Sequence, residues 1–280
     1  RGAKLGIVGV KGTPPASTLS PPTPASSSIT PLTISTLFAG LKNLYSPSVI
    51  TFQGAKRMWL GGWLTDADVG PDKIYYSELS GSTWMRPQEV FKKEGFHVND
   101  PSVIQPPSSD GVDRSNWLYM YYTALDNTSA ASAAEMVKRN VVGLASSIDG
   151  GKTWTDHGIV ISQNNGLDAA GAWSPSAIVV GNEIWIYYHT NEPAPRTLRT
   201  RFNLTGFQQI DTRRVTMPFS STCVPYCVSN VDVSRESSRY VMLANTTDLK
   251  NVLRFVSSDG LTWTTDSQMQ TEYLIRGGSA

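Results

Sequence analysis

One carboxylate stands out among the residues that could do chemistry, because its surroundings are repeated without it. Asp100 opens the segment Asp100–Ile104 (Asp-Pro-Ser-Val-Ile), and similar segments open at Ser46 and at Ser174. A looser copy spans residues 229–233. Only the second copy has an acid directly before its proline. A carboxylate can act as a general acid or base, whereas a serine needs an activating partner at neutral pH. The simpler interpretation of Asp100 is a turn residue that accepts backbone N–H groups.

Each of these segments is the first part of a repeated unit, and the strands that follow it in the unit are expected to hold it in place. An aromatic strand follows each segment, at residues 58–63, 118–122, 184–188 and 240–243. A further strand that runs into a turn comes next, at residues 74–77, 141–146, 198–202 and 252–256. Units of this length are typical of four-stranded propeller blades. The second unit is longer, and residues 126–138 within it predict an insertion with a short helical turn.

The turns after the third strands also repeat. Residues 147–154 and 257–263 share the pattern Ser-x-Asp-Gly followed by Thr-Trp, and residues 80–84 and 203–207 are weaker versions. In such a turn the aspartate caps the backbone, the glycine adopts positive φ and the tryptophan packs beneath. The pattern resembles the Asp-box of sialidases and many other propellers. These aspartates are therefore expected to be structural and not catalytic.

The repeats predict an all-β, five-bladed β-propeller that forms a single domain overall. Four blades are explicit from residue 46 to the C-terminus. The fifth is expected from strands within residues 1–40 together with Tyr273–Ile275, so that both termini close the ring and remove exposed sheet edges. Residues 1–45 would supply N-terminal strands and a Pro/Ser-rich arm, and residues 46–280 the blades. Four blades with additional decoration is the alternative.

Composition narrows the classes of partner. Charged residues make up 17% of the chain and the formal net charge is +1, so we expect no nucleic-acid partner. No apolar run reaches the roughly 20 residues that span a bilayer, so we expect no membrane insertion.

Cys223 and Cys227 could close a small disulfide loop or remain free thiols. No motif requires a metal or a cofactor. We expect an exported protein, extracellular or periplasmic, whose signal is not in this chain, and a monomer or a part of a larger chain.

The segment at residues 100–104, the blade repeats and the Trp/Tyr-rich second strands resemble the furanosidase superfamily. This superfamily contains glycoside hydrolase family 43 and the related invertase and levansucrase families, and the resemblance covers residues 44–265 as blade repeats. It implies a glycan pocket at one end of the central channel, with one acid from each of the first three blades. Asp100 matches the second-blade acid, which orients substrate and tunes a neighbouring pKa. Ser46 and Ser174 stand at the other two positions, so family-type hydrolysis lacks two of its acids.

Other acids are candidates for the missing roles. Asp72 follows the aromatic strand of the first unit, and Glu192 follows that of the third. The loop after this strand emerges at the end of the propeller where the first strand begins, so both acids are expected at the pocket rim. In this hypothesis Asp100 orients the substrate, and Asp72 or Glu192 donates the proton. The substrate-binding candidates are Trp63, His97, Trp173 and His189, together with Ser46 and Ser174. Core packing is the alternative for the tryptophans and for His97.

The sequence therefore favours a carbohydrate-active propeller whose partner is an oligosaccharide or polysaccharide. The alternative is a non-catalytic glycan-binding or structural module of an exported protein, which the serine replacements support. A sialidase is a third hypothesis, suggested by the turns. It requires six blades and a convergent arginine cluster, and the sequence places neither.

Overall fold

The chain, represented by a computed structural model, divides into two units, residues 1–31 and residues 32–280. The structure describes part of the second unit. The described residues are 38, 41–108, 110–128, 132–162, 167, 170–190, 196–218, 228–246 and 252–266.

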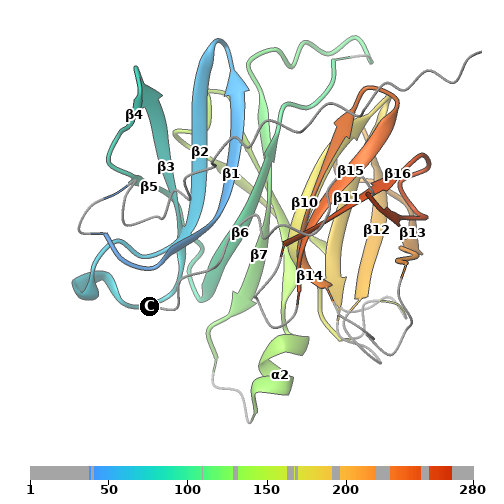
Figure 1. Ribbon diagram of the computed structural model, residues 1–280. Coiled ribbons are helices and arrows are strands. Elements are labelled where there is room, and N and C mark those ends of the chain that lie inside the picture. Colours follow the sequence, from blue (N-terminus) through green and yellow to red (C-terminus); the bar gives the residue numbers. More distant parts are fainter. Residues whose placement is uncertain are drawn as a thin grey trace, which may run out of the picture. The chain divides into compact units, whose positions relative to one another are not determined.

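Four antiparallel sheets contain nearly all the regular structure of the described residues (Figure 1). The first sheet comprises β1 (Leu44–Phe52), β2 (Ala55–Gly62), β3 (Lys73–Ser80), β4 (Thr83–Trp84) and β5 (Gln88–Phe91). The second comprises β6 (Phe96–Ile104), β7 (Leu118–Asp126), β8 (Val141–Ser147) and β9 (Thr155–Ile161). The third comprises β10 (Trp173–Val180), β11 (Glu183–Thr190), β12 (Arg196–Asn203) and β13 (Gln209–Arg214). The fourth comprises β14 (Val228–Glu236), β15 (Arg239–Thr246), β16 (Val252–Ser257) and β17 (Thr264–Thr265).

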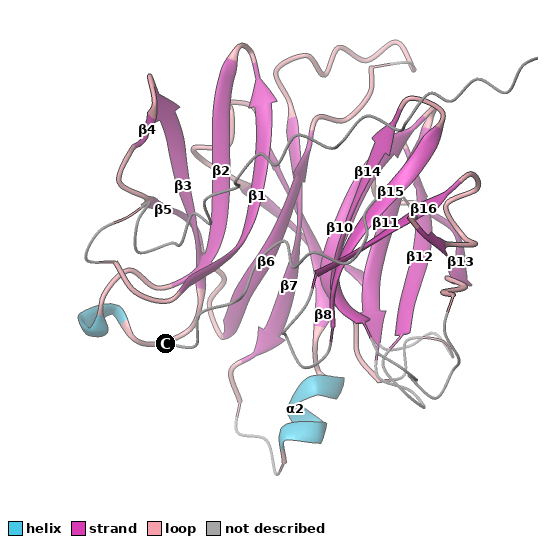
Figure 2. Ribbon diagram, in the orientation of Figure 1, coloured by secondary structure: helices cyan, strands magenta, loops and turns pink. Residues whose placement is uncertain are grey.

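Helical structure is confined to two short elements within the described residues (Figure 2). One is a 3₁₀ turn at Asp66–Asp68, and the other is α2 (Ala133–Lys138), which confirms the helical turn predicted in the second unit. Ser132 caps α2 by accepting a hydrogen bond from the backbone N–H of Glu135. The all-β prediction is therefore correct.

The sheets are arranged as propeller blades. β1 packs against β6, β6 against β10, and β10 against β14, so the first strand of each sheet is its innermost strand. Four blades are found, and not the five predicted. The strands expected for the fifth blade, within residues 1–40 and at Tyr273–Ile275, lie outside the described residues, so that blade stays a prediction.

Each innermost strand carries a β-bulge at the residue that opens the repeated segment. The opening residues have positive φ: 48° for Ser46, 47° for Asp100, 49° for Ser174 and 49° for Asn230. The pairing register of each strand shifts at this point. In the fourth blade the equivalent residue is thus Asn230. The bulge re-aims this side chain relative to the regular alternation of a strand, and four such residues converge where the strands meet.

In the first three repeats, the serine that follows the proline joins neighbouring blades. Its hydroxyl oxygen accepts a hydrogen bond from a backbone N–H on the innermost strand of the next blade. The three pairs are Ser48 with Val103 at 2.9 Å, Ser102 with Ala177 at 2.9 Å, and Ser176 with Val233 at 2.8 Å. The repeated Ser/Asp-Pro-Ser sequence therefore has a structural reason in the first three blades.

Aromatic side chains of the second strands fill the space between blades. Trp59, Tyr121, Tyr122, Tyr187 and Tyr188 are fully buried. One apolar cluster joins the first and second blades, another the second and third, and another the third and fourth. The large, flat side chains predicted from sequence to form strands thus bury the blade faces.

The Ser-x-Asp-Gly turns are built on carboxylate caps. Asp149 Oδ1 accepts from the backbone N–H of Lys152 and of Thr153, at 3.1 and 3.0 Å. Asp259 Oδ1 accepts from the backbone N–H of Leu261 and of Thr262, at 2.8 and 2.7 Å. Both aspartates hold the turn backbone, as the sequence predicts.

Each of these turns also receives hydrogen bonds from the preceding blade. Arg57 and Trp59 of the first blade donate to the carbonyls of Gly150 and Gly151, at 2.8 and 2.9 Å. Tyr187 of the third blade donates to the carbonyl of Gly260 at 2.9 Å. The turns therefore connect blades as well as strands.

Asp259→Ala is expected to lower the free energy of unfolding at neutral pH by about 1–2 kcal/mol, because two backbone N–H groups lose their acceptor. Partial burial acts to raise the pKa of Asp259, but hydrogen bonds from the turn lower it to about 2. The folded pKa lies below the unfolded value near 4, so this stabilisation is present above about pH 4 and is lost as pH falls toward 2. Urea unfolding at pH 7 and pH 3 measures both effects. Glu94→Ala, on the exposed loop after β5, is the control, and an equal loss in both variants would contradict the role of the turn.

Candidate functional site

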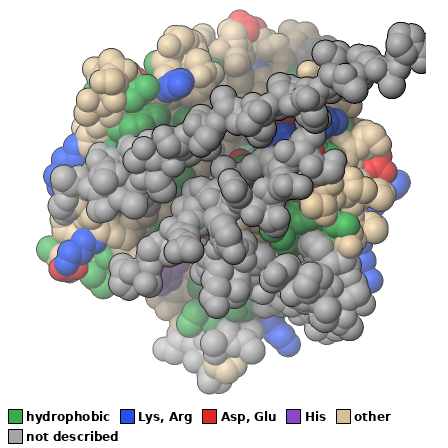
Figure 3. Space-filling view, viewed as in Figure 1, with side chains coloured by type: hydrophobic (Ala, Val, Ile, Leu, Met, Phe, Trp, Pro, Cys, Tyr) green, Lys and Arg blue, Asp and Glu red, His purple; other side chains and the backbone are tan. Residues whose placement is uncertain are grey.

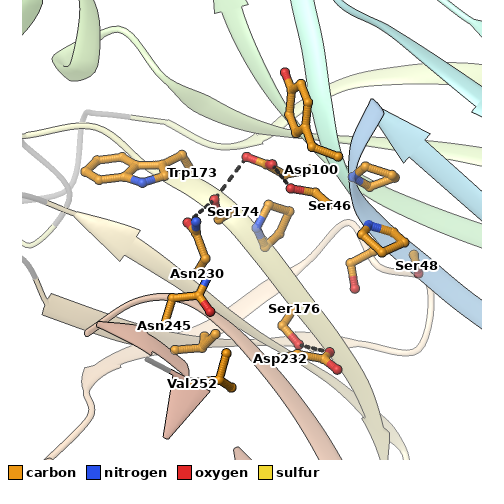
Figure 4. Close-up of a pocket in the computed structure, with 16 residues that line it drawn as sticks. Ser46, Ser48, Asp100, Trp173, Ser174, Ser176, Asn230, Asp232, Asn245 and Val252 are labelled. Atoms are coloured by element: carbon orange, nitrogen blue, oxygen red, sulfur yellow. Dashed lines mark hydrogen bonds between the residues drawn. The ribbon is translucent and has the colours of Figure 1, made fainter. Parts of the chain in front are cut away.

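A cavity of about 750 Å³ lies where the innermost strands of the four blades converge (Figure 4). Its wall contains the opening residue of each blade and the residue two positions further along the strand. Tyr45, Trp173, Asn245 and Val252 add to the wall. The cavity is thus built by the repeat itself, where the innermost strands of the described blades meet.

The first layer of the cavity is a hydrogen-bonded set of opening residues. Ser46 Oγ donates to Asp100 Oδ1 at 2.5 Å, and Ser174 Oγ lies 3.0 Å from Asp100 Oδ2. Thr123 Oγ1 lies 3.1 Å from the same oxygen. Ser174 Oγ is also 2.9 Å from Asn230 Oδ1. Figure 4 shows the side chains of Ser46, Asp100, Ser174 and Asn230 pointing toward one another.

Asp100 is held by hydroxyl groups and by no cation among the described residues. Part of its surface is reachable from the cavity, but the carboxyl lies deep among the strands, and this burial raises its pKa. Hydrogen bonds from Ser46, Ser174 and Thr123 oppose the rise, and the negative charge of Asp72 adds to it. The arrangement suits a fixed hydrogen-bond acceptor better than a free base.

The second layer contains the three joining serines and one acid. Asp232 occupies in the fourth blade the place that Ser48, Ser102 and Ser176 hold in the others. Ser176 Oγ lies 3.3 Å from Asp232 Oδ1, which is a long hydrogen bond. Burial raises the pKa of Asp232, and the hydrogen bond from Ser176 opposes the rise. The cavity therefore holds a second carboxylate.

Asp72 lies beside this cavity, outside its wall. Its Oδ2 accepts from Tyr45 Oη at 2.8 Å and from Asn99 Nδ2 at 3.2 Å, and Tyr45 separates it from the cavity. His97 Nδ1 accepts from the backbone N–H of Asp72 at 3.1 Å. Burial and the adjacent Asp72 carboxylate raise the pKa of Tyr45. Asp72 and His97 thus form one cluster behind Tyr45, and neither lines the cavity that contains Asp100.

His189 is buried, at 1% exposure, and does not line the cavity. Its ring lies 6.3 Å from that of Trp173, which does, and its Nδ1 lies 3.2 Å from the carbonyl of Arg196. Burial lowers the pKa of His189 to about 4. The side chain is therefore neutral at physiological pH and supports Trp173 from behind.

Some of the other predicted site residues line the cavity and others do not. Ser46, Ser174 and Trp173 line the cavity with Asp100, whereas Trp63 is absent from its wall. Glu192 lies outside the described residues. Sequence reasoning missed Tyr45, Asn230, Asp232 and Asn245. Asn230 and Asp232 carried a signal, since both fall within the looser fourth copy of the repeat.

The molecular surface shows no concentration of positive charge on the face in Figure 3, where Lys and Arg side chains of the described residues are scattered. The formal net charge of +1 agrees with this distribution. Within the described ranges no helix is long and apolar enough to cross a membrane.

No protein-family model matches the sequence, and no curated protein matches it. Solved structures do match the fold. A family 117 glycoside hydrolase from the marine bacterium Zobellia galactanivorans aligns with a TM-score of 0.60 at 17% identity, over 81% of this chain and 70% of that one. A family 43 glycoside hydrolase from Xanthomonas citri, solved with xylotriose, has a TM-score of 0.59 at 12% identity, over 82% and 74%.

A family 32 β-fructofuranosidase from Bombyx mori aligns with a TM-score of 0.60 at 13% identity, and covers 82% of this chain. This chain spans only 50% of the length of that enzyme. At these identities the likeness shows the fold: this chain is a propeller of the type found in glycoside hydrolases of families 117, 43 and 32.

Proposed function

We propose that this protein binds a glycan in the cavity at the centre of its blades, without hydrolysing it by the two-carboxylate mechanism. The cavity has the size of a small-molecule site, and its wall combines hydroxyl, amide and carboxylate groups with one tryptophan. Such a wall offers donors and acceptors to sugar hydroxyls and an aromatic face to a sugar ring.

The observation that carries this proposal is the hydrogen bonding of Asp100. The furanosidase superfamily has its other two acids at the blade positions of Ser46 and Ser174. Here the hydroxyls of these serines contact the Asp100 carboxylate instead. The first layer then has one carboxylate, and hydroxyls already occupy both its oxygens. Glycoside hydrolysis needs two carboxyl groups with distinct roles. Binding a sugar hydroxyl, in contrast, needs only one carboxylate as hydrogen-bond acceptor.

Hydrolysis is the second candidate, because Asp232 places another carboxylate in the same cavity. Its raised pKa favours the protonated form that a general acid requires. In this version Asp232 protonates the leaving oxygen and Asp100 orients the sugar. Release of reducing sugar that is lost in Asp232→Asn would establish hydrolysis and replace the binding proposal.

The experiment titrates the protein with neutral oligosaccharides from plant and microbial polysaccharides by calorimetry and assays the same mixtures for reducing sugar. We expect saturable binding and no new reducing ends. Trp173→Ala should weaken binding about tenfold, because truncating a buried tryptophan contact costs more than about 1 kcal/mol. Trp117→Ala is the matched control, since Trp117 is half-buried and outside the cavity. Binding of no glycan in this set, or equal loss in both variants, would contradict the proposal.

A further inference from the structure

Two carboxyl groups line the cavity, and no cationic side chain of the described residues pairs with either of them. Among the described residues that line it are Asp100 and Asp232, and none is Lys, Arg or His. Carboxylates elsewhere on the sheets commonly have cationic partners: Asp211 pairs with Arg201, and Asp156 with Lys93. No ion pair joins Asp100 or Asp232 to a described residue. A ligand in this cavity therefore meets two carboxyl groups that no described cation pairs with, and a cationic ligand would stabilise their charged forms.

The two cavity acids, Asp100 and Asp232, differ in how many hydrogen bonds their carboxylate oxygens already accept. The Asp100 oxygens contact the hydroxyls of Ser46, Ser174 and Thr123. The contact of Asp232 within the described structure is the long one from Ser176, at 3.3 Å. In Figure 4, Asp232 and Ser176 lie apart from the set around Asp100. Asp232 is thus the carboxylate better able to take a new, short, charge-assisted hydrogen bond.

Other serines of the second layer line the same cavity as Asp232 and supply the complementary groups. The oxygens of Ser48 and Ser102 accept backbone N–H groups of the next blade, at 2.9 Å in each case. Each hydroxyl then retains a proton that it can donate into the cavity. A ligand that carries both hydroxyl oxygens and a positive charge would satisfy these groups together.

Building on the proposed glycan function, we propose that the cavity selects sugars bearing a free amine, with the ammonium group on Asp232. Neutral sugars bind more weakly, and acidic sugars, such as uronates and sialic acids, are excluded. The ammonium gains a hydrogen bond to a charged group, whereas a carboxylate ligand meets two carboxylates of like charge. The same two carboxyl groups disfavour the sialidase hypothesis suggested by the turns.

The test is calorimetric titration with three trisaccharides of similar size: a β-1,4-linked glucosamine trimer, cellotriose and trigalacturonate. At a pH at which the amine is protonated, we expect the amine-bearing trimer to bind at least tenfold more tightly than cellotriose, and trigalacturonate not to bind. Rising salt should reduce the preference, because the charge is partly screened. Asp232→Asn should weaken the amine-bearing trimer about tenfold and change cellotriose by less than threefold.

Glu135→Gln, on the exposed face of α2, is the control for loss of one negative charge and should change none of the affinities. Equal binding of the amine-bearing and acidic trimers, or an Asp232→Asn variant that loses both ligands equally, overturns the selectivity. Thermal unfolding of each variant separates a local effect from misfolding. If neutral oligosaccharides bind and the amine brings no gain, only this inference fails. If the wider neutral set also fails to bind, the proposed function fails with it.

Discussion

Trp59→Ala is expected to lower the free energy of unfolding by about 3–5 kcal/mol, the range for truncating a buried aromatic side chain. Trp59 is fully buried, and its ring contacts those of Tyr76 and Trp154, with centroids 5.6 and 6.1 Å away. Its Nε1 donates to the carbonyl of Gly151 at 2.9 Å. The substitution therefore removes packing within the first blade and a hydrogen bond to the turn of the second.

Trp59→Phe separates these two contributions. Phenylalanine keeps most of the aromatic packing but removes one of two hydrogen bonds to the Gly151 carbonyl, which also accepts from Trp154 Nε1 at 3.0 Å. We therefore expect a loss of about 0.5–1.5 kcal/mol. Urea unfolding, monitored by circular dichroism, gives the free energies of both variants. The half-buried Trp117, replaced by alanine, should cost less than Trp59→Ala. A loss below about 1 kcal/mol for Trp59→Ala would show that the first two blades are not held together at this contact.

The architecture could be predicted because the sequence repeats the same physical devices. The aromatic strands at 118–122 and 184–188 are found as β7 and β11, and the Ser-x-Asp-Gly turns have the predicted carboxylate caps. These features are local: a strand buries alternate residues, and an aspartate binds N–H groups two to four positions away. Local interactions leave a clear pattern in a single sequence.

The composition of the cavity was harder to predict, because β-bulges break the alternation of a strand. The bulge in β14 makes Asn230 the equivalent of Asp100, one position after the start of the looser copy at 229. Asp232 then falls on the cavity wall, although a regular count does not place it there. Asp72 shows a different limit: the sequence predicts it at the pocket rim, whereas it lies outside the cavity wall and contacts Tyr45, which lines the cavity. No sequence pattern reports which side chain stands in front of another.

Asp100→Asn is expected to separate ligand binding from stability. Asparagine suits the backbone, because Asn230 has φ of 49° at the equivalent position and Asp100 has 47°. Its amide can still pair with the hydroxyls of Ser46 and Ser174. A sugar hydroxyl would lose a charged acceptor, and such hydrogen bonds contribute about 1.5–3 kcal/mol. Glycan affinity should therefore fall about 10- to 150-fold.

The stability of the same variant should change in the opposite direction, because burial raises the pKa of Asp100. The folded chain then binds this proton more tightly than the unfolded chain, so the stability of the native protein falls as pH rises through the folded pKa. Asparagine carries no charge. We therefore expect Asp100→Asn to be more stable than the native protein at neutral pH, with the difference shrinking as pH is lowered toward 4, the ordinary carboxyl range.

Two measurements test both parts: urea unfolding from pH 4 to pH 8, and calorimetric titration with the neutral glycan. Each is made on the native protein, on Asp100→Asn and on the exposed-site control Glu94→Gln. A more stable variant with weakened binding is the pattern of a functional group kept at a cost to the fold. A variant that is less stable and binds glycan normally would instead identify Asp100 as a structural cap. The three hydroxyls would then serve only to satisfy the hydrogen bonds of a buried turn residue. The glycan would have to bind to the second layer, which contains Asp232.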